Sequence, residues 1–473
     1  MTKSAELDGP EPAPQGARPS GAAGRIARGL AANFAGNGIT LLIQFVSVPI
    51  FLTAWGVPAY GEWLVLSAVP TYLALSDLSF SSVAGNSMVM LVAQGRSADA
   101  VRLGRRLWSI VTVMTGLAVL AAVAIALVFG SAFGSGAAIP ASEAQIVLVA
   151  LFLQVAVGTQ YGVLDAWYRA GERYPTGATL RQIGRLLEFG ALMSAILLGG
   201  SPATAAIAFL AGSVAGFGVS WVVLRRVVPW STFRLDRPHL QTFRELWAPG
   251  LAYMAFPIAS AMSLQGFTIV VGYVLGAPAV VVFSATRTVT RGALLIVFSV
   301  TASIFPELSR SVGGGSFQEA RTILRGAVRV SVLSSAAISA VLVFLGPTII
   351  RWWTHGNVDP PWEVLWPLLL VVVLDSLWLT LSAVITATNR HRRLAVVSLL
   401  VNGVALGAAL PLSYALGLPG AALALLSIEV SMLVFVVPQA LRIVHEVPRN
   451  FLRALLDVPG ALRWVTSRLR SPA

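Results

Sequence analysis

The sequence predicts an all-α polytopic membrane protein with about 12 transmembrane helices in two pseudo-symmetric six-helix lobes. Composition is the first reason: 56% of the 473 residues are hydrophobic and 11% are charged, against about 25% charged residues in a soluble domain. The second reason is a series of apolar segments long enough to cross a bilayer, for which about 20 residues suffice. The third is the clustering of arginines between alternate segments, which is typical of polytopic membrane proteins.

Length and hydropathy place the individual elements. Residues 1–24 are rich in Pro, Gly, Ala and Ser, and we expect them to form a disordered cytoplasmic tail. The expected spans are approximately residues 30–54, 62–93, 107–129, 143–166, 183–200, 205–224, 247–273, 279–306, 330–350, 362–388, 394–414 and 420–441. Pro49, Pro70 and Pro257 interrupt their helices, which predicts kinks that are either hinges or static bends.

The segments outside the spans have distinct compositions. Residues 225–246 are expected to form a cytoplasmic linker between lobes at 25–224 and 247–441. In the C-terminal segment 442–473, apolar and arginine residues alternate. This pattern predicts a basic amphipathic helix on the anionic inner leaflet, and a simple solvated tail is the alternative.

The arginines also predict the orientation. With a cytoplasmic N-terminus, the outer loops together hold only Arg351. This positive-inside bias indicates that both termini are cytoplasmic. Five tryptophans lie where an aromatic belt at the outer interface is expected, namely Trp55, Trp63, Trp352, Trp353 and Trp362.

A weak internal repeat supports the two lobes. Gly56-Val57-Pro58-Ala59 follows the first span, and Gly276-Ala277-Pro278-Ala279 follows the seventh, 220 positions later. Both halves start from the cytoplasm, so the repeat is parallel. We therefore expect an axis along the membrane normal and a site near the midplane between the lobes.

Composition also excludes several function classes. The net charge of +13 lies in short clusters between apolar runs, which indicates topology rather than nucleic-acid binding. The chain has no cysteine, and its four histidines are scattered without metal-ligand spacing. Lys3 is the only lysine, so no P-loop is present. The outer loops are too short for a glycan polymerase or ligase. We expect no enzyme activity, no metal site and no bound cofactor.

Two arginines lie inside the predicted span 279–306. Arg287 and Arg291 are four residues apart and share one helix face. Arg291 lies roughly 18 Å from Ala279 along a helix, near the middle of the hydrocarbon. A guanidinium there costs about 3 to 10 kcal/mol and rarely faces lipid. The functional interpretation is a cationic cavity that receives an anion; the alternative is that buried carboxylates neutralise both arginines and hold the helices together.

Three acids and several amides are the other intramembrane polar groups. Asp77, Asp375 and Glu429 lie within spans, where they either pair with the arginines or bind and release H⁺ or Na⁺. Polar side chains of the first two spans suit a hydrated cavity wall or, alternatively, hydrogen bonds between helices. The candidate substrate-binding residues are Arg287, Arg291, Asn33, Asn37, Gln44 and Asn86; the candidate ion-coupling or cavity residues are Asp77, Asp375 and Glu429.

Five short runs resemble one transporter family. They are Tyr60-Gly61-Glu62-Trp63, residues 72–78 (YLALSDL), Ala84-Gly85-Asn86, residues 283–291 (FSATRTVTR) and residues 305–309 (FPELS). Together they resemble bacterial oligosaccharide flippases of the multidrug/oligosaccharidyl-lipid/polysaccharide exporter superfamily, over essentially residues 25–442. Ser79 stands where this pattern usually has glycine, and Gln265 lies near where many relatives carry an acid.

The resemblance implies an activity. Such proteins are inner-membrane transporters with two six-helix lobes that open alternately inward and outward. They move polyprenyl-diphosphate-linked oligosaccharides for O-antigen (lipopolysaccharide), capsule or exopolysaccharide. On this reading Arg287 and Arg291 engage the diphosphate, and the partners are the lipid-linked glycan, membrane lipids and glycan polymerase machinery, with no nucleic acid. The alternatives are a multidrug/toxin extruder of the same superfamily and a non-transporting accessory subunit of a glycan synthase.

Overall fold

The computed structural model describes residues 19–74, 80–129, 138–236, 254–388 and 391–456, and every regular element within these ranges is helical. This confirms the predicted fold class. The N-terminal bundle contains α1 (Pro19–Ala74), α2 (Phe80–Ala93), α3 (Ser97–Phe129), α4 (Ala141–Ala170), α5 (Tyr174–Leu197) and α6 (Pro202–Val227). The C-terminal bundle contains η2 (Met262–Gly266), α8 (Phe267–Leu275), α9 (Ala277–Arg291), α10 (Leu294–Gly313), α11 (Phe317–Trp353), α12 (Trp362–Ala387), α13 (His391–Leu416) and α14 (Leu418–Ile443). A short helix, α15 (Pro448–Leu456), follows.

Ten helices among the described residues are long and apolar enough to cross a bilayer. The number differs from the predicted 12 for two reasons. The first two predicted spans share α1, which is counted once. The predicted span at 183–200 corresponds to α5, which carries Arg181, Arg185 and Glu188 and is therefore less apolar than its neighbours.

Two glycines break the helices at equivalent positions of the repeat. Gly56 inside α1 has φ 74° and ψ 175°, and Gly276 between α8 and α9 has φ 84° and ψ 172°. A positive φ favours glycine because it has no Cβ. In both places a proline follows two residues later, at Pro58 and Pro278. The shared backbone conformation is what the predicted repeat requires.

The predicted span at 279–306 is covered by α9 and α10, with a local distortion at Gly292 and Ala293, both of which keep right-handed helical dihedral angles. The Gly292 amide donates to Val289 O at 3.2 Å, and the Ala293 amide donates to Thr290 O at 3.4 Å. These three-residue bonds tighten the chain into a turn, and glycine is a poor helix former. Arg291 thus becomes the last residue of α9. The predicted span at 62–93 falls on the end of α1 and on α2, and residues 75–79 between them lie outside the described residues.

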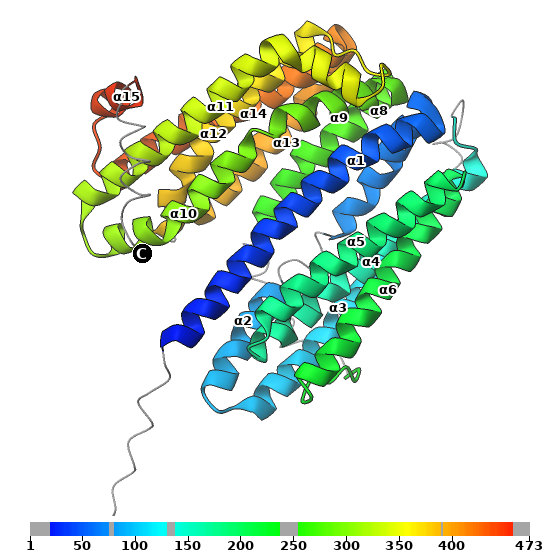
Figure 1. The fold of residues 1–473 in the computed structure, drawn as a ribbon, viewed down its shortest axis with the longest axis vertical. Coiled ribbons are helices and arrows are strands. Elements are labelled where there is room, and N and C mark those ends of the chain that lie inside the picture. Colours follow the sequence, from blue (N-terminus) through cyan, green and yellow to red (C-terminus); the bar gives the residue numbers. More distant parts are fainter. Residues whose placement is uncertain (1–18, 75–79, 130–137, 237–253, 389–390, 457–473) are drawn as a thin grey trace, which may run out of the picture.

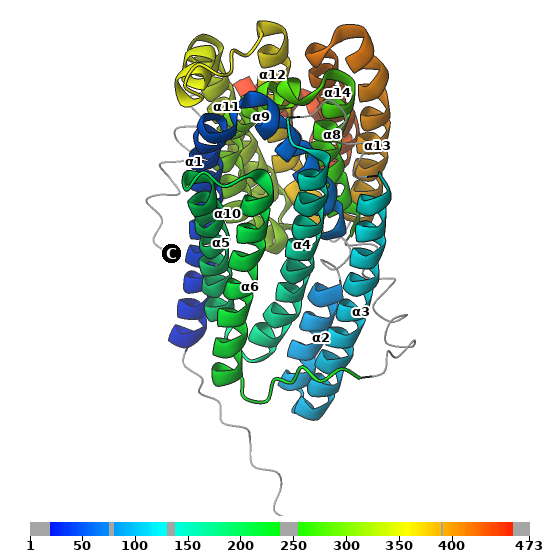
Figure 2. The same cartoon turned by 90° about the vertical axis from the view of Figure 1, so that its right-hand side faces the viewer.

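The two bundles form a V (Figure 1). They meet at one end, called the narrow end, and diverge toward the wide end, where the turn between α10 and α11 lies. Turned by 90°, the helices of both bundles run along the long axis (Figure 2). One buried apolar cluster joins the bundles at the narrow end, combining Phe51 and Trp63 of α1 with Val281 of α9 and Ile350 of α11.

Close contacts hold this narrow end together. Trp353 Nε1 donates to Phe45 O at 2.7 Å, and the rings of Phe45 and Trp353 lie 5.1 Å apart. Gly61 packs directly on the backbone of Ala277, where any Cβ would collide with the carbonyl. The contact between α1 and α9 therefore depends on a residue without a side chain.

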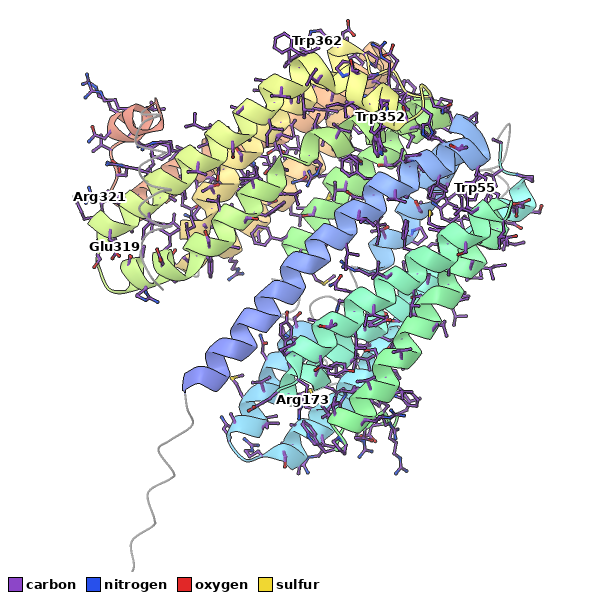
Figure 3. The ribbon with its side chains drawn as sticks, viewed as in Figure 1. Trp55, Arg173, Glu319, Arg321, Trp352 and Trp362 are labelled. Carbon is purple, nitrogen blue, oxygen red and sulfur yellow. The ribbon has the colours of Figure 1, made fainter. Side chains whose placement is uncertain are left out.

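Aromatic and basic residues mark opposite ends of the molecule. In Figure 3, Trp55, Trp352 and Trp362 lie toward the narrow end, whereas Arg173 and Arg321 lie at the wide end. Trp352 is 80% exposed, as a belt residue should be. The belt prediction is wrong for Trp63 and Trp353, which are 5% and 7% exposed, because they pack between the bundles.

The predicted segment boundaries stay predictions. Helix α1 begins at Pro19, inside the predicted tail of residues 1–24, and α6 ends at Val227, near the start of the predicted linker. In the predicted C-terminal tail, α15 is amphipathic, with Phe451 buried and Leu452 exposed. It packs against α11. Residues 457–473 lie outside the described residues.

Candidate functional site

A cavity of about 510 Å³ lies where α1 meets the helices from η2 to α10. We call it the main cavity. Its polar lining comes from both bundles and includes Gln44 and Ser67 of α1, Gln265 of η2, and Arg287 and Arg291 of α9. The structure therefore places both predicted arginines, with Gln44, around one space between the bundles.

Neutral oxygens hold the Arg287 guanidinium. Nη1 donates to Ser263 O at 3.3 Å, and Nη2 donates to Leu264 O at 3.0 Å and to Thr268 Oγ1 at 3.2 Å. The guanidinium carbon also lies 5.2 Å from the Phe283 ring centroid. None of these contacts is a carboxylate, so the positive charge is solvated by the protein but not neutralised.

The π-helical turn η2 explains why these carbonyls are available. A π-turn widens the helix by one residue, which takes carbonyl groups out of the regular ladder and is frequent at functional sites. Ser263 and Leu264 lie within this turn. Their oxygens therefore face Arg287 across the gap between η2 and α9.

Arg291 lies at the boundary between two cavities. Together with Leu264 and Phe298, it lines the main cavity and also a smaller cavity of about 190 Å³ inside the C-terminal bundle. Arg291 makes no hydrogen bond or ion pair to the residues that the structure describes. Its guanidinium is therefore available to a ligand in the main cavity, and it shares the smaller cavity with Asp375 and Glu429.

The smaller cavity contains two of the predicted acids, and we call it the acid cavity. Asp375 of α12 and Glu429 of α14 are 9% and 6% exposed. Glu429 Oε2 accepts a hydrogen bond of 2.5 Å from Trp378 Nε1. Asp375 has no hydrogen-bonding partner in the described part of the chain. Two carboxylates and one guanidinium thus surround one small space.

The predicted residues of the N-terminal bundle are placed differently. Only Gln44 lines the main cavity. Asn86 of α2 is exposed, and its Oδ1 accepts from Arg169 Nη1 at 3.3 Å. That bond joins α2 to α4. It fits the alternative interpretation, in which these polar side chains form hydrogen bonds between helices. Asp77 lies outside the described residues, as do the side chains of Asn33 and Asn37 on α1.

Sequence reasoning missed a second polar pocket, of about 380 Å³, between α2, α4 and α5. It is lined by Asp165, Arg169 and Arg181, with an ion pair between Asp165 and Arg181. Arg169 also donates to Ser81 O at 3.2 Å. The sequence carried these arginines as topology signals, and only their distance from the end of the apolar run could have suggested a buried role.

Comparison with solved structures establishes the fold. The chain superposes on a multidrug resistance MATE family transporter of the MOP superfamily in its inward-facing conformation with a TM-score of 0.67, at 16% identity over 85% of this chain and 98% of that one. It superposes on the lipid II flippase MurJ, in an inward closed conformation, with a TM-score of 0.68 at 15% identity, covering 94% of this chain and 93% of that one. The chain has the fold of these transporters.

Sequence comparisons say less. No family model matches the chain. It is 26% identical over 215 residues to the uncharacterized membrane protein EpsK of Bacillus subtilis (strain 168), which covers 44% of this chain and 41% of that protein. The match thus spans less than half the length of that curated relative. It is consistent with a membrane protein, as the ten candidate spans indicate.

Proposed function

We propose that this protein is a flippase that moves a polyprenyl-diphosphate-linked oligosaccharide across the bacterial inner membrane by alternating access, for cell-surface polysaccharide synthesis. The observation that carries the proposal is Arg291, a cation at the wall of the main cavity that makes no hydrogen bond or ion pair to the described residues. Arg287 beside it keeps its charge un-neutralised. An anion in the main cavity would neutralise the charges of both arginines.

The chemistry of the head group fits this pair. Arginine's planar fork binds phosphate oxygens through parallel hydrogen bonds, and charge-assisted bonds are roughly twice as strong as neutral ones. Arg287 is held in place by three acceptors, whereas Arg291 is free to turn toward a ligand. We infer that Arg287 fixes the position of one phosphate and Arg291 closes on the other. The shared fold with the lipid II flippase MurJ supports a lipid-linked substrate.

The V shape supports an inward-facing state. If the arginine-rich wide end faces the cytoplasm, the main cavity opens to the side where the substrate is made. The TM-score is 0.67 against the inward-facing MATE structure and 0.54 against an outward-facing one. To reverse, the narrow end must open, which breaks the hydrogen bond from Trp353 to Phe45 and separates Gly61 from Ala277. In this proposed orientation, both termini lie on the cytoplasmic side.

We propose that the acid cavity couples transport to H⁺ or Na⁺. Two ionised carboxylates beside one guanidinium leave one negative charge in excess in a low-dielectric space, which is costly unless a cation binds. Asp375 and Glu429 supply the two carboxylates. A glycan polymerase that uses the exported unit is the expected functional partner.

A multidrug extruder is the second candidate, and the MATE neighbours favour it. Two arginines in the main cavity would repel a cationic drug. The acid cavity, at about 190 Å³, is smaller than the about 300–1,000 Å³ typical of drug-sized pockets. The charge distribution therefore favours an anionic substrate.

A binding assay distinguishes the two candidates. Purified protein in detergent is titrated with a polyprenyl-diphosphate sugar and, separately, with a cationic dye. The flippase proposal expects saturable binding of the diphosphate lipid that weakens in Arg287→Gln and Arg291→Gln. Binding of the dye alone, or unchanged binding of the diphosphate lipid by the double variant, would contradict it.

A further inference from the structure

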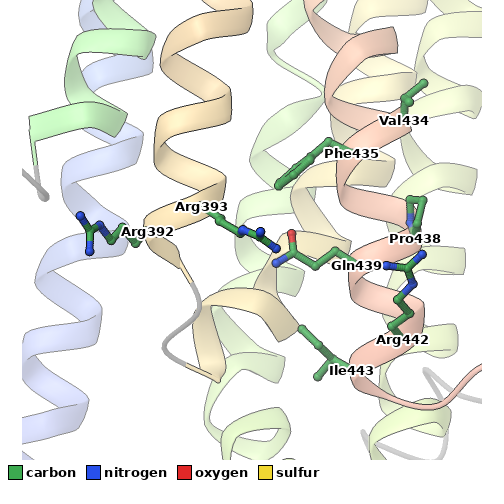
Figure 4. Close-up of a pocket in the computed structure, with 8 residues that line it drawn as sticks. All are labelled: Arg392, Arg393, Val434, Phe435, Pro438, Gln439, Arg442 and Ile443. Carbon is green, nitrogen blue, oxygen red and sulfur yellow. The ribbon is translucent and has the colours of Figure 1, made fainter.

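A basic cleft of about 620 Å³ lies between the start of α13 and the end of α14 (Figure 4). Arg392 and Arg393 of α13 and Arg442 of α14 line it, together with Gln439 and the apolar residues Val434, Phe435 and Pro438. It shares no lining residue with the main cavity or the acid cavity. The cleft is therefore a separate feature, and α13 lies at the edge of the molecule (Figure 2).

The cationic groups converge without a counter-charge. In Figure 4 Arg393 extends from α13 toward Gln439 of α14, and Arg442 lies on the far side of Gln439 and runs along its own helix, whereas Arg392 extends away. No carboxylate lines the cleft. Within the described ranges, none of the three arginines forms an ion pair. Like charges that line one cleft repel each other, so an anion bound in the cleft lowers the electrostatic energy.

The position of Arg393 within its helix strengthens this point. Arg392 and Arg393 belong to the first turn of α13, which begins at His391. The N-terminal end of a helix carries a partial positive charge, so cations are unfavourable there and anions are favourable. An anionic ligand is therefore favoured by the first turn of α13 and also by Arg393 and Arg442.

The rest of the cleft is apolar and continues along the membrane-facing surface. Val434 is 72% exposed, and Val430 one turn earlier is also exposed, as are Val396 and Leu400 on α13. From Arg442 to Val434, the two ends of the cleft on α14, the rise is roughly 12 Å, within the about 15 Å thickness of one leaflet's hydrocarbon. A charged end and an apolar groove of this length match a head group and its acyl chains.

We infer that this cleft binds an anionic phospholipid of the leaflet at the wide end, with the phosphate between Arg393 and Arg442 and an acyl chain along Val434. Basic pockets between transmembrane helices on the cytoplasmic side are suited to anionic head groups. Gln439 adds an amide that can hydrogen-bond to a glycerol head group. The site does not depend on the proposed transport activity.

The test is retention of phosphatidylglycerol by the full-length protein. The protein is reconstituted into nanodiscs of nine parts phosphatidylcholine to one part phosphatidylglycerol, extracted gently and weighed by native mass spectrometry. The wild type is expected to retain phosphatidylglycerol in preference to phosphatidylcholine. Each basic residue near an anionic membrane contributes about fivefold, so R393Q/R442Q should retain it about 25-fold less tightly.

R225Q/R226Q is the matched control. Arg225 and Arg226 are exposed in the last turn of α6, at the same end of the other bundle, and their replacement removes the same charge. The control should retain phosphatidylglycerol like the wild type. Equal loss in both variants would show a general surface-charge effect and overturn the site, as would full retention by R393Q/R442Q. A melting curve and a gel-filtration profile establish that each variant is folded.

A second comparison separates a lipid from a free anion. Val434→Asn should weaken retention of phosphatidylglycerol but leave binding of soluble glycerophosphoglycerol unchanged, because only the acyl chain contacts this residue. Inorganic phosphate that displaces the lipid as effectively as added phosphatidylglycerol would identify a free-phosphate site and overturn the lipid assignment.

Discussion

Arg291→Gln tests the charge of the main cavity with little interference from stability. The side chain makes no hydrogen bond or ion pair to the described residues, although it lines both cavities. Replacing it with glutamine removes the charge and preserves most of the volume. We therefore expect only a small change in the melting temperature, because the lost attraction to the Asp375 and Glu429 carboxylates in the acid cavity is opposed by the lower cost of burying a neutral side chain.

The effect on ligand binding should be large. A hydrogen bond to a charged group is worth about 1.5–3 kcal/mol, and a guanidinium fork makes two of them to a phosphate. The expected loss of about 3 kcal/mol corresponds to roughly 100-fold weaker binding of the polyprenyl-diphosphate head group, at 1.4 kcal/mol per factor of ten. A large loss of binding should thus come with little change in stability.

The assay is a titration of the purified protein with the diphosphate lipid, next to a thermal melt of the same sample. Arg310→Gln is the matched control, because Arg310 lies in the last turn of α10, is exposed and lines neither cavity. It should bind like the wild type. The reasoning is refuted if R291Q binds the head group with native affinity, or if its binding loss is matched by a comparable loss of stability.

The remaining predictions concern the other parts of the site. Arg287→Gln removes three hydrogen bonds to Ser263, Leu264 and Thr268, so we expect a loss of about 2–5 kcal/mol of stability, measured by thermal unfolding; an unchanged melt would contradict the packing role. The chain has no cysteine, so F45C and W353C would carry its only thiols; joining them with a short bifunctional thiol reagent should lock the narrow end and stop export, and continued export by the cross-linked form would exclude opening there. Glu429→Gln keeps an acceptor for Trp378; it should fold normally but lose the dependence of export on an H⁺ or Na⁺ gradient, and retained dependence would remove Glu429 from coupling.

The identity of the functional residues was easier to predict from the sequence than their positions relative to one another. The two arginines were identifiable because a charge within an apolar run is costly wherever the helix packs. That Arg287 would be solvated by a π-turn was not predictable, since η2 is a local departure from a regular helix. The meeting of Arg291 with Asp375 and Glu429 depends on three helices whose order in the chain does not define their contacts.

Some sequence interpretations failed for the same reason. Trp63 and Trp353 stand at span ends, as belt residues do, yet they are buried where the bundles meet. Asn86 bonds to Arg169 and does not line the main cavity. In each case the position of the residue along its span was predicted correctly, but contacts with a neighbouring helix fixed the direction of its side chain.

The sequence by itself determined the all-helical membrane fold and the glycine breaks at Gly56 and Gly276, because hydropathy and backbone preference are properties of consecutive residues. The tertiary structure decided which charges share a space: it turned Arg291 to the boundary of two cavities and gathered the acids behind it. The physical reason is that the rotation of each helix about its axis is fixed by side-chain packing between segments far apart in the chain.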